Sequence, residues 1–486
     1  MGDGKAVTAS LVASLGAFLF GLDIGYIAPI LECASFKRDV GHLPDFADPK
    51  SKISSMEAGF IVGIFSLGCL TTSFPPISSY FLDEIGRRSS IILGGIIFLL
   101  GCGLQAGSGS IATFLFGRLV TGTSIGLLSN VVPLYQAEMA PPALRGTLTS
   151  MYNMMITAGI FTAALLDMLL VEKNNGWRAA ICLQAIPAMI ILVVMPCLPR
   201  SPRWLVRQGR ITEASDALTI LRGAETGAKE LEEILKEFKA ECEVASGTWK
   251  EVFSGRVVRL VAIGASLQLL QQLVGMNAFM YFGPRMFKHL DLDPNLFQTI
   301  ANGVNMVFTL PALYFIERTG RRSLLVVGAL GMAISSFTLG VLGLWGTRGH
   351  GEEVTPNSEL IARILAAMVL FFIASFAATW GPTVWVYCAE MFPLRHRARC
   401  LGVTTMTNWV GNFLIAQFTP VLLSAMGFGT FIIFAGFSVT ALFLGLWLPE
   451  TRGIPLEQIG HCFDERFGVL VKTSATEGYG AVEKRL

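Results

Sequence analysis

Four stretches of this chain, each long enough to form a membrane-spanning helix, contain no charged residue. They run from Ser89 to Gly117, from Ala179 to Leu198, from Ser323 to Gly346 and from Met426 to Leu448. A helix needs about 20 apolar residues to cross the hydrocarbon core of a bilayer. Only 15% of the 486 residues are charged, whereas soluble domains average about 25%. A soluble protein would have to bury all four stretches in one core, so the sequence predicts an all-α, polytopic membrane protein.

The hydropathy pattern predicts twelve transmembrane helices in two six-helix halves. Their centres lie near residues 18, 66, 98, 123, 158, 188, 270, 306, 334, 375, 412 and 437. We assign residues 1–200 to the N-terminal half, 201–256 to a cytoplasmic linker, 257–450 to the C-terminal half and 451–486 to a cytoplasmic tail. The linker stretch from Glu213 to Val244 is rich in Ala, Glu, Leu and Lys, which favours short amphipathic helices outside the bilayer.

The arginines of the short loops predict the orientation. Arg87 and Arg88 follow the second span, and Arg318, Arg321 and Arg322 follow the eighth. The loops after the third and eleventh spans carry almost no charge. Because Lys and Arg are enriched in cytoplasmic loops, both termini are expected to be cytoplasmic.

Two loop motifs occur once in each half. Asp83-Glu84-Ile85-Gly86-Arg87-Arg88 matches Glu317-Arg318-Thr319-Gly320-Arg321-Arg322, and Glu138-x-x-Pro141-x-x-x-Arg145 matches Glu390-x-x-Pro393-x-x-x-Arg397. Parallel repeats with a substrate site between them near mid-membrane are a transporter plan. We predict that the charged members form a cytoplasmic gate, an ionic latch that breaks when the halves rock: Asp83, Arg87, Arg88, Glu138, Arg145, Glu317, Arg321, Arg322, Glu390 and Arg397. The alternative is that these charges only set the topology.

Asp23 lies deep in the first predicted span. An ionisable residue inside the bilayer costs about 2.5–3.5 kcal/mol on insertion scales, so it needs a partner or a protonation role. Arg118, at the start of the fourth span, is the nearest candidate partner in the topology. A carboxyl group balanced between burial and a neighbouring arginine can load and release a proton. A static structural ion pair is the alternative.

Polar amides cluster in otherwise apolar helices. Gln268, Gln271 and Gln272 fall on one helical face, at i, i+3 and i+4. Amides donate and accept hydrogen bonds, which suits a neutral polyhydroxylated ligand. Individually, each amide could instead bond to a neighbouring helix. The predicted substrate-binding residues are Asn153, Gln268, Gln271, Gln272, Asn277, Asn305, Trp385, Asn408 and Trp409.

Several function classes have no support in the sequence. It contains no G-x-x-x-x-G-K-[ST] phosphate-binding motif, metal-ligand spacing or nucleophile constellation. The nine cysteines fit no metal motif, and the net charge of +2 gives no reason to expect a nucleic-acid partner. We therefore expect no enzyme activity, no metal and no cofactor, with the proton as the only coupling ion.

Seven ordered motifs resemble those of the sugar porter family of the major facilitator superfamily, from about residue 10 to 460. They are Gly117-Arg118, Pro133-x-Tyr135-x-x-Glu138-x-x-Pro141-x-x-x-Arg145-Gly146, Pro199-Arg200-Ser201-Pro202-Arg203-Trp204-Leu205, Gln271-Gln272-Leu273-Val274-Gly275-Met276-Asn277, Trp380-Gly381-Pro382-x-x-Trp385, Asn408-Trp409-x-x-Asn412-Phe413 and Pro449-Glu450-Thr451-Arg452-Gly453. Each motif is weak alone, but in this order the set is specific. Within that family, the chain resembles the proton-coupled monosaccharide transporters of fungi and plants.

The resemblance implies a major facilitator fold that alternates between outward-open and inward-open states. It implies that six residues line the sugar site: Gln271, Gln272, Asn277, Asn305, Trp385 and Asn408. It also implies that Asp23 occupies the position where proton-coupled members carry an aspartate. Four residues depart from the family pattern: Asn153 replaces Gln, Phe282 a frequent Tyr, Arg200 a Glu and Leu22 a Tyr.

The leading hypothesis is a monomeric proton symporter for a hexose or pentose in the plasma membrane, whose partners are the sugar and the lipid bilayer. A facilitative uniporter in which Asp23 is structural is the first alternative. A non-transporting sugar sensor is the second, and the short tail after Glu450 gives it little support.

Overall fold

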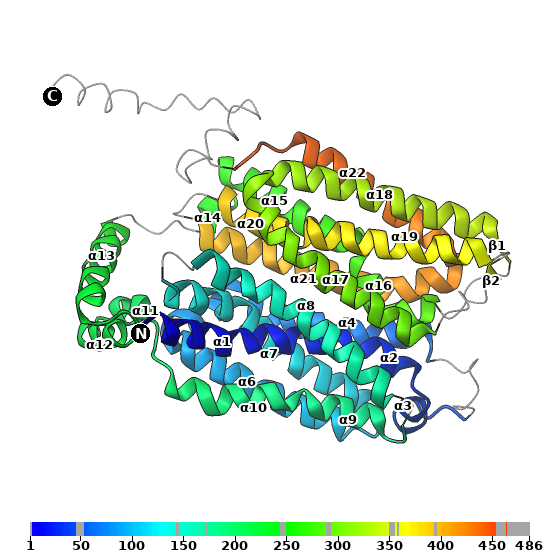
Figure 1. Cartoon of the computed structure of the whole chain (residues 1–486), viewed down its shortest axis with the longest axis horizontal. Coiled ribbons are helices and arrows are strands. Elements are labelled where there is room, and N and C mark those ends of the chain that lie inside the picture. The colour runs from blue at the N-terminus through cyan, green and yellow to red at the C-terminus, as the bar shows by residue number, and fades with distance from the viewer. Residues whose placement is uncertain are drawn as a thin grey trace.

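The chain folds into a long bundle of helices that run roughly along one axis (Figure 1). The structure is a computed structural model, and it describes residues 2–44, 53–141, 145–171, 173–243, 249–287, 293–348, 355–356, 359–392, 396–452 and 463. A few side chains within these ranges, among them those of Arg145 and Glu317, lie outside the description.

The N-terminal half contains the first six predicted spans. Its helices are α1 (Gly2–Gly25), α2 (Ile27–Glu32), α3 (Ala34–Asp39), α4 (Ser55–Ser73), α5 (Pro75–Ser79), α6 (Arg87–Ala106), α7 (Ile111–Met139), α8 (Arg145–Leu170), α9 (Gly176–Leu183) and α10 (Ala185–Val194). A π-helical stretch (Tyr80–Ile85) leads into α6, and a 3-10 turn (Met195–Cys197) follows α10.

The linker and the C-terminal half follow, and the predicted tail lies outside the described residues except for 451–452 and 463. The linker helices are α11 (Pro202–Arg207), α12 (Ile211–Arg222), α13 (Ala224–Glu243) and α14 (Trp249–Val252). The second half contains α15 (Gly255–Leu273), α16 (Met276–Phe287), α17 (Pro294–Arg318), α18 (Arg321–Gly346), α19 (Glu359–Ala378), α20 (Trp380–Met391), α21 (Arg397–Met426) and α22 (Thr430–Trp447). Strands β1 (Thr347–Arg348) and β2 (Thr355–Pro356) form a small antiparallel hairpin.

The predicted membrane architecture is confirmed. Among the described residues, eleven continuous helical stretches are long and apolar enough to cross a bilayer. The last of them, from Arg397 to Trp447, contains α21 and α22 separated by the turn Gly427–Gly429. It therefore crosses twice, which gives twelve spans, and every predicted centre lies within one of these helices.

The two halves meet along three helix pairs. We call the end of the bundle with the turns at Gly86 and Gly320 the arginine end, and the opposite end the far end. Helices α4 and α21 pack along their length, and Ser66 Oγ donates to Asn412 Oδ1 over 2.9 Å. Toward the far end α8 packs on α17, where Thr299 Oγ1 approaches the carbonyl of Ala164 at 3.5 Å, and α2 packs on α16. These contacts close the halves against each other at the far end.

Close helix crossings depend on glycine at a few positions. A Cβ atom at Gly21 of α1 would lie 2.9 Å from the Cα of Gly159 on α8 and would collide with the carbonyl oxygen of Ile156. Small residues allow helix backbones to approach this closely, and in a membrane such packing is a main source of helix association.

We expect Gly21→Ala to destabilise the bundle, because α1 and α8 must move apart. Overpacking of this kind costs roughly 1–3 kcal/mol. The measurement is thermal unfolding of the purified protein in detergent, with Gly103→Ala as the control, because a Cβ at Gly103 meets nothing within 4 Å. Equal melting temperatures for the two variants would contradict the packing argument.

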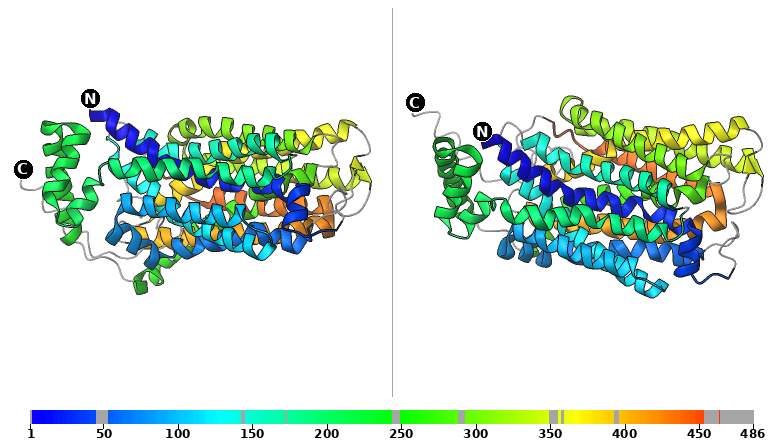
Figure 2. Two further views of the ribbon diagram at one scale, coloured as in Figure 1. Left: turned by 90° about the horizontal axis from the view of Figure 1, so that it is seen from below. Right: turned by 60° about the horizontal axis from the view of Figure 1, so that its bottom comes forward.

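Three linker helices form a small separate unit at the arginine end, where Figure 2 shows them beside the N-terminus. Trp204, Leu205, Leu218 and Ile234 belong to its apolar core. Amphipathic helices were predicted here, and they bury one face among themselves. Trp204 Nε1 and Gln208 Nε2 donate to the carbonyl of Asp83 at 2.7 and 2.8 Å, which attaches the unit to the N-terminal half.

Candidate functional site

The ion pair predicted between Asp23 and Arg118 lies inside the N-terminal half. Arg118 Nη1 on α7 is 2.6 Å from Asp23 Oδ2 on α1, and each side chain is only 1% exposed. The second carboxylate oxygen, Asp23 Oδ1, has no hydrogen-bond partner among the described residues. The structure therefore brings together the two residues proposed for proton coupling, while their role stays a prediction.

Neutral groups complete the surroundings of this pair. Arg118 Nη1 donates to Tyr26 Oη at 3.1 Å, and Arg118 Nε lies 3.3 Å from the carbonyl of Ile61. Tyr26 in turn donates to the side-chain oxygen of Gln105. The Arg118 guanidinium also lies 4.9 Å from the ring centroid of Phe65. Because Arg118 keeps these partners, it can release Asp23 without losing every contact.

The predicted amides of the C-terminal half form one hydrogen-bonded chain. Asn277 Nδ2 donates to Gln272 Oε1 at 2.5 Å, and Gln272 Nε2 donates to Asn408 Oδ1 at 3.0 Å. Asn408 Nδ2 donates to Gln268 Oε1 at 2.7 Å and to Gln271 Oε1 at 2.9 Å. Five of the predicted residues, from α15, α16 and α21, are thus joined, and Asn408 lies at the centre of the chain.

Broken helices position these amides. Between α15 and α16 the chain turns at Gly275, whose φ of +97° is a left-handed conformation that glycine adopts without strain. A Cβ there would also lie 2.6 Å from the ring of Phe434. Gln271 Nε2 donates to the carbonyl of Trp380, where α19 gives way to α20, at 2.9 Å. Interrupted helices that free backbone and side-chain polar groups are typical of transporter binding sites.

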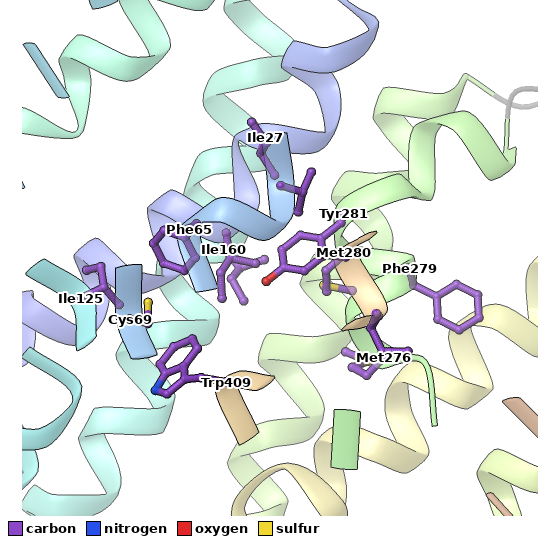
Figure 3. Packing of buried hydrophobic residues seen from close by; sticks show 14 of the residues in the cluster. Ile27, Phe65, Cys69, Ile125, Ile160, Met276, Phe279, Met280, Tyr281 and Trp409 are labelled. Carbon is purple, nitrogen blue, oxygen red and sulfur yellow. The ribbon is translucent and has the colours of Figure 1, made fainter. Parts of the chain in front are cut away.

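An aromatic cluster lies between the amides and the N-terminal half. The Trp409 ring centroid is 5.6 Å from that of Phe20 and 6.3 Å from that of Phe65. Figure 3 shows Trp409 next to Phe65, and Tyr281 pointing across toward Ile160. Trp409 Nε1 and Gln268 Nε2 are buried donors with no hydrogen-bond partner among the described residues. Free donors beside aromatic faces suit a ligand with both hydroxyl groups and an apolar ring face.

Three predicted sugar contacts lie outside the amide chain. Asn305 is buried on α17, Asn153 is half-buried on α8, and Trp385 on α20 is 37% exposed. The hydrogen bonds of the described residues do not join their side chains to the amides. Phe282 stands where the family frequently has a tyrosine. The residue before it, Tyr281, has a hydroxyl that donates to Asn412 Oδ1 at 3.0 Å.

The charged turns at the arginine end repeat in both halves. Arg87 Nη2 is 2.9 Å from Glu138, and Arg321 Nη2 is 2.8 Å from Glu390. The next residues, Arg88 and Arg322, donate to backbone carbonyls of Leu198 and Leu446, each at 2.8 Å. Similarly, the Tyr135 and Tyr387 hydroxyls donate to the carbonyls of Pro199 and Pro449.

The predicted latch between the two halves stays a prediction. Arg87 with Glu138 joins α6 to α7, and Arg321 with Glu390 joins α18 to α20, so each described pair stays within one half. Asp83 is 3.8 Å from Arg87 but largely exposed, and Arg397 donates to the carbonyl of Phe392 at 3.3 Å. In each half the arginine at the start of one helix pairs with the carboxylate near the end of a neighbouring helix. The side chains of Arg145 and Glu317 lie outside the described residues.

The departure at Arg200 makes the two halves unequal. In the C-terminal half, Glu450 accepts hydrogen bonds from the backbone N–H groups of Arg321 at 2.8 Å and Arg322 at 3.1 Å, at the start of α18. The equivalent residue Arg200 cannot accept, and its guanidinium lies 5.6 Å from the ring centroid of Trp204. Partial burial and the positive charges of Arg88 and Arg210 lower the pKa of Arg200.

We expect Glu450→Ala to lower the stability of the C-terminal half by roughly 1–2 kcal/mol, the usual cost of removing an acceptor from a helix N-terminus. Arg200→Ala is the matched control, because it removes no acceptor from a backbone N–H group. The readout is thermal unfolding in detergent. A smaller effect for Glu450→Ala than for Arg200→Ala would show that the capping contact is unimportant.

Sequence reasoning missed one buried carboxyl group. Asp167 on α8 is 1% exposed, and neither of its side-chain oxygens has a hydrogen-bond partner among the described residues. The signal that identified Asp23, an ionisable residue within an apolar span, was equally present here. Tyr26 and Gln105 were also missed, because a single Tyr or Gln in a span carries little information without its neighbours.

Comparison with known proteins identifies the family to which this chain is similar. The family profile described as "Sugar (and other) transporter" matches residues 9–463. The chain is 35% identical to the major facilitator-type transporter ecdD of Aspergillus rugulosus, over 95% of this chain and 88% of the relative. It is 33% identical to the high-affinity glucose transporter ght5 of Schizosaccharomyces pombe, over 95% and 86%. It is 32% identical to the high glucose sensor RGT2 of Saccharomyces cerevisiae, over 94% of this chain but 60% of the relative.

The fold is that of a solved bacterial transporter. The proton:xylose symporter XylE, bound to 6-bromo-6-deoxy-D-glucose, aligns with a TM-score of 0.76 and 26% identity over 95% of this chain and 99% of that chain. The molecule is thus a membrane transporter of the major facilitator class. The chain belongs to the sugar transporter family, and it transports sugar and is not an enzyme.

Proposed function

We propose that this protein carries a monosaccharide, a hexose or a pentose, across the plasma membrane by proton symport. The observation that carries the coupling is the Asp23–Arg118 pair, 2.6 Å apart and 1% exposed on both sides. A charge pair at this depth is costly to form and is retained where it has a role. The relative ght5 is named a glucose transporter and XylE a proton:xylose symporter, which supports the sugar class and the coupling ion.

The proposed sugar site is the amide chain of Gln268, Gln271, Gln272, Asn277 and Asn408 with the Trp409 face. Asn153, Asn305 and Trp385 are proposed as further contacts from facing helices. A neutral sugar would exchange its hydrogen bonds to water for bonds to these amides, with little loss, because amides both donate and accept. No cofactor is needed in this scheme.

The arginine end is proposed to face the cytoplasm, with both termini there and the protein working as a monomer. Arg87, Arg88, Arg321 and Arg322 support this orientation through the enrichment of basic residues in cytoplasmic loops. The far end, where α2 meets α16 and α8 meets α17, then faces outward and is closed. We propose that the Arg87–Glu138 and Arg321–Glu390 pairs, with the other predicted gate residues, hold the helix ends of each half as a unit during rocking.

Two alternatives have specific support. A uniporter would keep Asp23 and Arg118 paired throughout its cycle, and the pair is formed in this structure. A sensor would resemble RGT2, although this chain spans only 60% of that relative. Uptake of a panel of labelled sugars by cells without their own sugar transporters, measured with and without a protonophore, separates the three. Uptake abolished by protonophore supports symport, protonophore-insensitive uptake supports uniport, and sugar binding without uptake supports a sensor.

A further inference from the structure

Asp167 is a buried carboxyl group that the proposed transport mechanism does not use. It lies on α8, one turn before the helix ends at Leu170, and its side chain is 1% exposed. Both carboxyl oxygens are buried, with no hydrogen-bond partner among the described residues. An isolated carboxylate in such surroundings is too costly to keep ionised, so the group is expected to be neutral.

The position of Asp167 places it at the contact that closes the far end. One turn earlier on the same helical face, Ala163 packs against Gly25, at the end of α1. Next to it, the carbonyl of Ala164 faces Thr299 of α17, in the other half, at 3.5 Å. Asp167 therefore stands where α8 meets both its own half and the opposite half.

A polar cleft opens one helical turn beyond Asp167. It has a volume of about 490 Å³ and is lined by residues of both halves, including Pro29, Glu32, Arg38, Val171, Lys173 and Asn295. Val171 follows Asp167 by four residues, on the same face of the chain, and its carbonyl accepts from Cys33 Sγ at 3.1 Å. The cleft thus comes to within about one turn, roughly 5.4 Å along the axis, of the buried carboxyl group.

We propose that Asp167 is a second proton-binding site, neutral while the far end is closed and reached by solvent through this cleft when α8 and α17 separate. Opening would hydrate the carboxylate and favour the ionised form, so closing the far end would take up one proton. Protonation of Asp167 would thereby favour the closed state of the far end, while Asp23 couples the proton to the sugar. The inference rests on alternating access in the proposed function, but not on the coupling ion or the sugar.

Other charged groups near this end have partners of their own. On α2 and α3, Glu32 lies 3.4 Å from Lys37, and Asp39 lies 2.8 Å from Arg38. Further charged groups at this end include Arg178 on α9, Lys173 after α8, Asp293, which caps the start of α17, Glu57 in the first turn of α4, and the Glu359–Arg363 pair on α19. None of the described ion pairs includes Asp167, so a change in charge at Asp167 is not absorbed by an existing pair.

Alkylation of Cys33 tests the proposal. Cys33 lines the cleft and is 3% exposed, so a membrane-impermeant maleimide reaches it when the far end opens. The alkylation rate of Cys33 is followed by peptide mass spectrometry in the purified full-length protein, without sugar or a proton gradient. It is measured in wild type, in Asp167→Asn and in Glu57→Gln. The last is the control, because Glu57 is an exposed acid at the same end. Because thiol ionisation also depends on pH, wild-type and Glu57→Gln rates are each divided by the Asp167→Asn rate at the same pH.

We expect both ratios to rise with pH, by up to about tenfold per unit, the limit for linkage to one proton. A ratio for wild type that does not change with pH would overturn the proposal. If Asp167→Asn does not fold, infrared spectra of wild type and Asp167→Glu decide: a protonated carboxylic acid band that shifts in the variant supports the proposal, and identical spectra overturn it. Failure of proton-coupled uptake would leave both readouts untouched, so the two proposals fail separately.

Discussion

Asp23→Asn abolishes accumulation of sugar against a gradient and removes sugar-induced proton influx. The variant keeps the shape of the side chain but cannot ionise, so it resembles a permanently protonated carboxyl group. In the structure the ionised form is stabilised by Arg118, 2.6 Å away. If rocking of the halves separates Asp23 from Arg118, burial then favours the protonated form of Asp23. Proton binding is thereby linked to helix position.

Exchange of labelled for unlabelled sugar is expected to survive in Asp23→Asn, since exchange requires no net release of a proton. The assays are proton influx and sugar uptake in vesicles with an imposed pH gradient. Asp39→Asn is the control, because Asp39 also pairs with arginines, but at the far end. Accumulation with proton influx in Asp23→Asn would remove symport from this residue, and a wild type without influx would establish the uniporter.

Gln272→Ala weakens the apparent affinity for sugar by about tenfold or more. Gln272 accepts from Asn277 at 2.5 Å and donates to Asn408 at 3.0 Å, so its loss removes the donor to Asn408 Oδ1 and the acceptor for Asn277 Nδ2. Each stranded buried polar group costs roughly 1–3 kcal/mol. The amides would then also present the wrong geometry to sugar hydroxyl groups.

The measurement is the concentration dependence of sugar uptake, corrected for the amount of protein in the membrane. Gln184→Ala is the matched control, because Gln184 is equally buried but lies between α9 and α10, away from the amide chain. Asn408→Ala, which breaks the centre of the chain, should be at least as severe as Gln272→Ala. Wild-type uptake kinetics in both Gln272→Ala and Asn408→Ala would remove the amide chain from the sugar site.

The membrane architecture could be predicted from the sequence because span length and apolarity are local properties. The stretch from Met426 to Leu448 needs no partner to be recognised as a span. The pairing of Asp23 with Arg118 was within reach for a related reason, since few charges lie inside the bilayer and each needs a partner. Because an unpaired charge inside the bilayer is costly, only a few pairings of charged residues need to be considered.

The hydrogen-bond partners of neutral groups could not be predicted in this way. Asn408 was a candidate from its place in an apolar helix, but its central position among the amides depends on how α15 and α21 pack. The sequence likewise shows that Arg87 and Glu138 are charged, but not that they pair with each other within one half. Asp167 was missed although the signal was present, because no arginine in the topology marked it as one of a pair.

The linker unit is attached to the N-terminal half, so it is expected to move with that half when the two halves rock. Trp204, Gln208 and Arg222 tie α11–α13 to the N-terminal half, through carbonyl groups of Asp83 and Met139. The short helix α14 packs instead on α15 and α21 of the C-terminal half. A fluorescent donor at an exposed site of α13, such as Lys236, and an acceptor at Lys250 on α14 would therefore ride on different halves. Each transport cycle would then be visible as a change in energy transfer outside the membrane, with no probe near the sugar.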